Sequence, residues 1–141
     1  MRKRLLLVTV LGGCVAAPTT ADNTTPAPVI QVQAGQQFQI VIGQDARLQK
    51  TGIVIKLVSV AEDSRCPSDV QCVWAGNARL ALDLSGGATG STRSSVNLTL
   101  DPQSVSYGGY VIRFVSLEPV PRSGKAIPAS NYVATLEAVA G

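Results

Sequence analysis

The segment ARLALDL, residues 78–84, places an apolar side chain at every second position, whereas the positions between them include Arg79 and Asp83. A period of two puts the apolar side chains on one face of an extended strand and the charged ones on the other. Gly76 and the glycine pair at 86–87 bracket the segment too closely for a helix. The segment therefore predicts a β-strand with one buried and one solvated face.

Other parts of the chain repeat this pattern between turn signals. Residues 53–60 (IVIKLVSV) are β-branched and nearly continuous, which is typical of a central strand that is buried on both faces. The remaining strand candidates are residues 29–32, 37–42, 96–100, 110–117 and 132–139. About seven short strands with frequent turns predict an all-β fold, either an antiparallel β-sandwich with an immunoglobulin-like look or a small barrel.

The N-terminus has the pattern of an export signal. Basic residues at 2–4 precede an apolar run at 5–11, which is too short to span a bilayer. The sequence LGGC at 11–14 resembles the lipobox of bacterial lipoproteins. This resemblance implies cleavage before Cys14, which then becomes a lipidated N-terminus. Val15 implies sorting to the outer membrane, where the cell has one.

The expected organisation has three parts. A signal peptide at 1–13 is followed by a lipidated N-terminus and a Pro/Thr/Ala-rich tether at 14–34, and then by a β-sandwich domain at 35–141. This arrangement places the domain in the bacterial cell envelope, anchored to a membrane and facing the periplasm or the exterior. Ordinary secretion, with cleavage after Ala21, is the alternative.

The formal net charge of +3 comes from the export signal. Arg2, Lys3 and Arg4 are three of the twelve basic residues, so their removal leaves nine Lys and Arg against nine Asp and Glu. A neutral chain is not expected to bind nucleic acid, which requires basic surfaces. The expected partners are the membrane, through the N-terminal lipid, and a protein of the envelope.

Cys66 and Cys72 allow three interpretations. If Cys14 is lipidated, they are the two remaining cysteines of an exported chain, where disulfides persist. A metal site or other cofactor is disfavoured because the sequence contains no histidine. A catalytic redox pair is disfavoured because the spacing is not C-x-x-C and because Pro67 and Asp69 do not stabilise a thiolate. We expect a structural disulfide, for which the chain-entropy model gives about 2–2.5 kcal/mol.

The pattern S-R-C-P-x-x-V-x-C-x-W-x-G-x-A, residues 64–78, resembles a motif of small exported bacterial lipoproteins. The resemblance implies kinship with that group and no particular activity. Trp74 lies two residues after Cys72 and therefore on the same side of an extended segment. We expect it to anchor the core beside the disulfide. An exposed aromatic used for recognition is the alternative.

No enzymatic activity is expected. Without histidine, a hydroxyl nucleophile would need a lysine or carboxylate base, and no Ser-x-x-Lys arrangement is present. Glu62, Asp63 and Asp69 crowd one loop, but they lack the spacing of a dedicated calcium loop. The acidic and basic residues are therefore expected to be solvated surface groups.

The expected function is that of a membrane-anchored, non-enzymatic binding or structural module. Loops on a rigid β-scaffold commonly carry function, and the loops at 63–76 and 119–128 are the candidates for contact. The candidate contact residues of the first loop are Arg65, Pro67, Asp69 and Trp74. One alternative is a secreted or anchored protease inhibitor that presents the disulfide-stiffened loop, and another is a thiol redox accessory protein.

Overall fold

The structure is a computed structural model that describes residues 12–14, 27–88 and 90–141. Most of the expected signal peptide and tether lies outside these residues. In the described part of the chain there are nine strands, one short 3-10 helix and no helix long and apolar enough to cross a membrane. The elements are β1 (Ile30–Val32), β2 (Gln37–Val41), β3 (Asp45–Leu48), β4 (Val54–Asp63), β5 (Ala78–Ser85), β6 (Thr92–Asn97), β7 (Ser104–Tyr107), β8 (Tyr110–Glu118), η1 (Ala129–Asn131) and β9 (Val133–Ala140).

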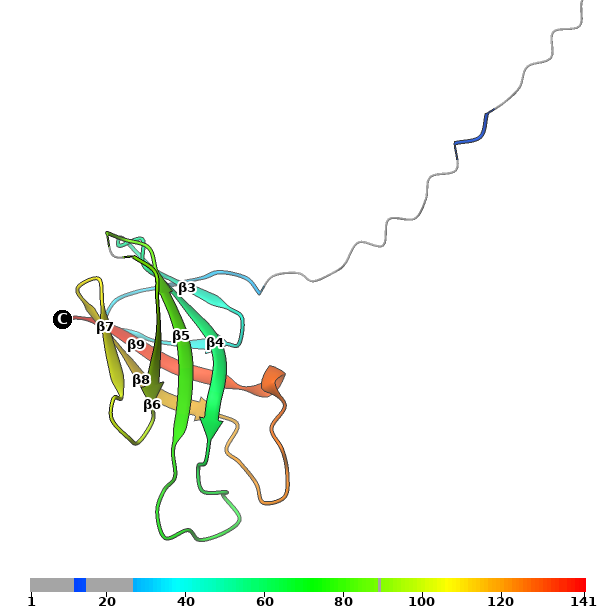
Figure 1. Ribbon diagram of the computed structural model, residues 1–141, viewed down its shortest axis with the longest axis vertical. Coiled ribbons are helices and arrows are strands. Elements are labelled where there is room, and N and C mark those ends of the chain that lie inside the picture. The colour runs from blue at the N-terminus through cyan, green and yellow to red at the C-terminus, as the bar shows by residue number, and fades with distance from the viewer. Residues whose placement is uncertain (1–11, 15–26, 89) are drawn as a thin grey trace, which may run out of the picture.

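The strands form two sheets that pack face to face, which confirms the expected all-β sandwich (Figure 1). The first sheet has the order β1-β3-β4-β5-β6 and the second has the order β2-β9-β8-β7. Neighbouring strands are antiparallel except for β1 and β3, which pair in parallel. Because β1 is part of the first sheet, the sandwich begins at Ile30, before the expected boundary at residue 35.

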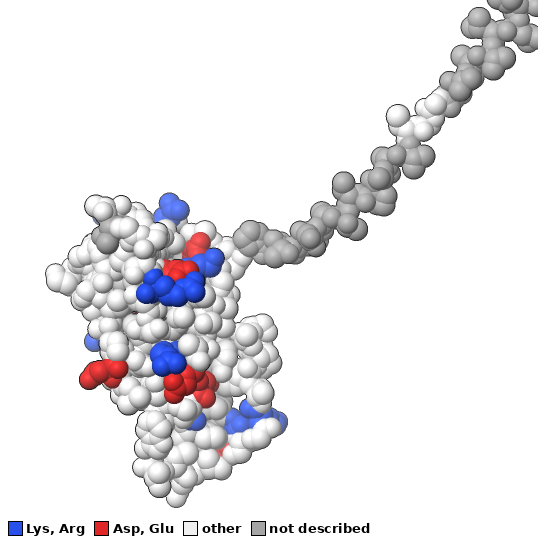
Figure 2. All heavy atoms as spheres, viewed as in Figure 1, with Lys and Arg blue, Asp and Glu red and all other residues white. Residues whose placement is uncertain are grey.

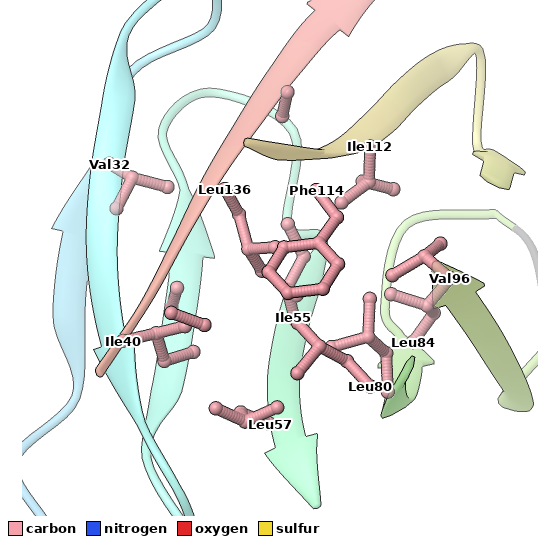
Figure 3. Packing of buried hydrophobic residues seen from close by; sticks show 14 of the residues in the cluster. Val32, Ile40, Ile55, Leu57, Leu80, Leu84, Val96, Ile112, Phe114 and Leu136 are labelled. Atoms are coloured by element: carbon pink, nitrogen blue, oxygen red, sulfur yellow. The ribbon is translucent and has the colours of Figure 1, made fainter. Parts of the chain in front are cut away.

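The core lies between the two sheets and follows the period-two patterns. Leu80, Leu82 and Leu84 of β5 are completely buried, whereas Arg79 on the other face is exposed. Figure 3 shows side chains of the first sheet packing toward Phe114 of β8 and its neighbours. Burial of this apolar surface is the main favourable term in folding, so the sandwich is a firm support for its loops.

Three loops lie together at one end of the sandwich, at the bottom of Figure 1. The disulfide loop (residues 64–77) joins β4 to β5, the second loop (98–103) joins β6 to β7, and the third (119–132) joins β8 to β9. We call these three loops together the loop end. The C-terminus lies away from it.

Candidate functional site at the loop end

The disulfide loop begins as a continuation of the β4–β5 ladder. The Ser64 amide donates to the Asn77 carbonyl at 2.7 Å, and the Cys66 amide donates to the Ala75 carbonyl at 3.0 Å. Beyond this stem, Cys66 and Cys72 form a disulfide with a Cα–Cα distance of 5.9 Å. The expected bridge is thus confirmed, and it closes the outer part of a hairpin-like loop.

Arg65 points into the molecule, although it was expected among the contact residues. Its Nε and Nη2 atoms donate to the two carboxylate oxygens of Asp63 at 2.7 and 2.8 Å, and the two side chains are only 10% and 11% exposed. Its guanidinium also donates to the carbonyls of Leu117 and Pro119. These carbonyls lie at the end of β8, so Arg65 joins the first sheet to the second. The guanidinium uses its donors inside the molecule and is therefore not a contact group on the surface.

Tyr132 completes the buried cluster around Asp63. Its hydroxyl donates to Asp63 Oδ2 at 2.9 Å. Burial by itself would raise the pKa of Asp63, but the hydrogen bonds from Arg65 and Tyr132 outweigh it, and the pKa lies below its ordinary value. Burial, together with the bond to Asp63, raises the pKa of Tyr132. Asp63 is therefore ionised at neutral pH and acts as a structural anion.

This depressed pKa predicts a stability change in acid. A carboxyl whose folded pKa is lowered stabilises the fold above its unfolded pKa of about 3.9, and the stabilisation is lost as the pH falls through the folded pKa. We expect the difference in free energy of unfolding between the wild type and Asp63→Asn to shrink between pH 6 and pH 3 in urea titrations. An equal difference at both pH values would contradict the assigned role of the carboxylate.

Asp69 ties the disulfide loop to the third loop. Its Oδ1 atom accepts hydrogen bonds from the Ser123 amide at 2.9 Å and from the Ser123 hydroxyl at 3.0 Å. The amide bond is the largest cause of the lowered pKa of Asp69. Ser68 adds a backbone bond to the Pro121 carbonyl at 2.9 Å. Asp69 is exposed but already engaged. Pro67 is half-buried, and its carbonyl accepts a hydrogen bond from the Val70 amide, so both residues support the loop.

A buried polar group ties the disulfide loop to the second loop. Asn77 is 1% exposed, and its Nδ2 atom donates to Asn97 Oδ1 at 2.9 Å. The Thr99 amide donates to Asn77 Oδ1, and the Thr99 hydroxyl donates to the Gly76 carbonyl at 2.6 Å. The sequence did not predict this group. Its only signal there is an asparagine next to β5 and another at the end of the neighbouring strand β6. This group holds two loops in a single arrangement.

Trp74 is exposed, which corrects the expected role as a core anchor. Its exposed fraction is 56%, and Val73 beside it is fully exposed. The physical reason is that both residues lie in the loop beyond the two sheets, where no second layer is available to cover them. The alternative interpretation, an exposed aromatic, agrees with the structure.

The free apolar side chains of the molecule gather at the loop end. Six large apolar side chains are exposed among the described residues, and five of them lie at the loop end. The sixth is Val29, near the start of β1. The other five are Val70, Val73 and Trp74 of the disulfide loop, Leu100 of the second loop and Val120 of the third. Figure 2 shows that the lowest part of the visible face is mainly uncharged. The loop end therefore presents five exposed apolar side chains on a polar frame, with the exposed cations Arg122 and Lys125 in its third loop.

Higher on the same view, charged residues are grouped in rows across the first sheet (Figure 2). Asp45, Lys56, Asp83 and Arg93 are register partners on four adjacent strands. Arg93 donates to both carboxylate oxygens of Asp83, at 2.7 and 2.9 Å, and this hydrogen bonding lowers the pKa of Asp83. Such opposite pairs are ordinary cross-strand stabilisation of a solvated sheet face.

Comparisons with protein-family models, with curated proteins and with solved structures found no match. The interpretation of the loop end therefore rests on its own geometry. The side chains of Arg65, Asp69, Asn77 and Thr99 are engaged with other groups of the loop end. Exposed beside them are the five apolar side chains and the charged side chains of Arg122 and Lys125 of the third loop. Among the described residues no group of three or more His, Cys, Asp or Glu side chains is placed to hold a metal ion. The arrangement is suited to contact with an apolar surface.

Proposed function

We propose that the chain is a lipid-anchored, non-enzymatic binding module of the bacterial cell envelope, and that it contacts an envelope protein through the loop end. The observation that carries this proposal is the exposure of Val70, Val73 and Trp74 on one braced loop. Exposed apolar side chains that gather on one part of a protein surface, rimmed by polar residues, are a common mark of an interaction site. Tryptophan is also among the residues that most often dominate binding energy at interfaces.

The bracing of the disulfide loop supports the same proposal. The disulfide constrains its outer part, Arg65 holds its base, and Asp69 holds its side against the third loop. Ordering a mobile loop on binding weakens an interface, and a loop that is already ordered avoids much of this cost. The frame therefore makes a small apolar patch a more effective contact surface.

The anchor is tested by Cys14→Ser in the full-length chain. Cys14 is exposed and free of disulfide bonding, and the proposal assigns the lipid to its thiol. We expect the wild type to partition into the membrane fraction, with the mass of a lipidated chain that begins at residue 14, and the variant to lose both properties. A wild-type chain that is cleaved after Ala21 and carries no lipid would contradict the anchor.

The contact surface is tested by site-specific photo-cross-linking in intact cells. A photoreactive residue at Val73 should give a discrete protein adduct, whereas the same residue at Val29 should not. Val29 is the matched control because it is 49% exposed but lies outside the loop end. Trp74→Ala should reduce the adduct at position 73 about tenfold, since loss of an interface tryptophan commonly has effects of this size.

The outcomes of this experiment separate the proposal from its alternatives. Equal adducts at positions 73 and 29, or no effect of Trp74→Ala, would contradict the contact surface. An adduct with a protease whose activity is blocked would instead favour the inhibitor. Because Trp74 is exposed, its replacement should change the free energy of unfolding by less than about 1 kcal/mol, and this measurement excludes misfolding as the cause.

A further inference from the structure

The second surface of interest is an edge rich in glutamine. Seven of the nine glutamines of the chain lie between residues 31 and 49, and residues 27–44 contain no charged side chain. Two strands from this segment, β1 and β2, are edge strands of the first and the second sheet. We call the six residues Gln31, Gln33, Gln36, Gln37, Gln39 and Gln49 the glutamine edge.

Three adjoining hollows follow the glutamine edge. The middle one, of about 190 Å³, is lined by Val32, Phe38 and all members of the edge except Gln39. It shares Gln33 and Gln49 with a hollow of about 310 Å³ that also involves Lys50 and Tyr110. It shares Gln37 and Phe38 with a hollow of about 240 Å³ that reaches Thr135 on the second sheet. Shared lining residues make the three hollows one continuous shallow groove.

The amides of the glutamine edge are free to bind. All six side chains are exposed, and within the residues that the structure describes none of them makes a hydrogen bond. Gln44, outside the edge, differs because its amide bonds both the Val41 amide and the Pro28 carbonyl. Each glutamine offers two donors and one acceptor with two lone pairs. The groove therefore presents many uncharged donors and acceptors on neighbouring side chains.

Two aromatic rings complete the groove. Phe38 and Tyr110 are partly buried and pack against the core, so their positions are fixed. A sugar ring carries hydroxyl or acetamido groups around its rim and apolar C–H groups on its faces. Amide side chains match the rim, and a fixed aromatic ring matches the face.

We propose that the glutamine edge binds a neutral glycan strand, in particular one with acetamido groups. Lys50 is the single charged side chain that lines the groove, so a strongly anionic polymer has little to pair with. An extended peptide could pair with the free edge of β2. However, such a peptide would follow one strand of one sheet, whereas the groove crosses from β1 in the first sheet to Thr135 in the second. The glycan accounts for the whole groove.

The proposal is tested by titrating the full-length chain, in detergent, with the linear tetramer of N-acetylglucosamine. NMR should show shifts of the glutamine-edge side-chain amides and of the amides next to Tyr110. The double variant Gln33→Ala/Gln37→Ala should lower the affinity about tenfold, because two hydrogen-bonding side chains are lost. The matched control is Gln71→Ala/Gln103→Ala, which removes the two glutamines outside residues 31–49 and should leave the affinity unchanged.

Two results would overturn the glycan assignment. One is the absence of shifts at the glutamine edge up to about 10 mM tetramer, a concentration that would detect even millimolar binding. The other is an equal loss of affinity in the control variant. Shifts confined to the β2 backbone on adding an extended uncharged peptide, with none on adding the tetramer, would replace the glycan by a strand partner. None of these results bears on the cross-links at Val73, so the two proposals can fail separately.

Discussion

Replacing Gly76 by alanine should destabilise the protein by at least about 3 kcal/mol. Gly76 has a φ of +73°, and a Cβ atom at this position would lie 1.9 Å from the Ser64 carbonyl oxygen. This oxygen belongs to the backbone of the loop stem, so it cannot move without opening the stem. The substitution would therefore disturb the neighbouring hydrogen bond between the Thr99 hydroxyl and the Gly76 carbonyl as well.

Gly109→Ala is the matched control for this substitution. Gly109 also has a positive φ, of +81°, but a Cβ atom there would meet nothing within 4 Å. Gly109→Ala should lower the free energy of unfolding only by the cost of holding alanine in a left-handed conformation, about 1–2 kcal/mol. Urea titrations of both variants measure the difference. Similar losses of stability in both variants would show that the close approach of the Ser64 carbonyl oxygen is not what destabilises Gly76→Ala.

Replacing Arg65 by methionine should cost about 3–5 kcal/mol, the range for breaking one partner of a buried ion pair. Methionine keeps much of the side-chain volume but leaves the Asp63 carboxylate without its cation. It also removes the donors for the Leu117 and Pro119 carbonyls. Arg65→Lys should recover only part of the loss, because an ammonium group cannot reproduce the planar, two-pronged pairing of a guanidinium.

Arg93→Met is the matched control for Arg65→Met. Arg93 pairs with Asp83 through the same two-pronged geometry, but the two side chains are 64% and 41% exposed. Exposed pairs contribute little, so the loss should be below about 1 kcal/mol. The free energy of unfolding at neutral pH tests both variants. An equally small loss for Arg65→Met would mean that water reaches the pair around Asp63.

The strands with long alternating patterns could be predicted from the sequence, and two of the short ones could not. Residues 78–84 predicted β5 almost to its ends, because every second side chain packs in the core. The strands β3 and β7 were missed. Each has four residues and therefore too few alternating positions to stand out from a turn.

The disulfide was also predictable, but the surroundings of the loop were not. Two cysteines suffice to predict a bridge in a chain that is expected to be exported, since few other fates would be open to them there. Arg65, by contrast, bonds carbonyls 52 and 54 positions away in the sequence. Local pattern has no information on which distant segment will lie beside a loop. The same limitation placed Trp74 in the core, because its exposure depends on where the second sheet ends.

The Asn77–Asn97 pair has a consequence for the rate at which the loop end would bind the proposed partner. This buried pair and the bonds of Asp69 join all three loops, so the surface is presented in one shape before any encounter. Docking then needs no slow rearrangement, and association should proceed in one kinetic phase that depends linearly on partner concentration. Variants of the apolar side chains at the loop end should accordingly differ in affinity mainly through the dissociation rate of the complex.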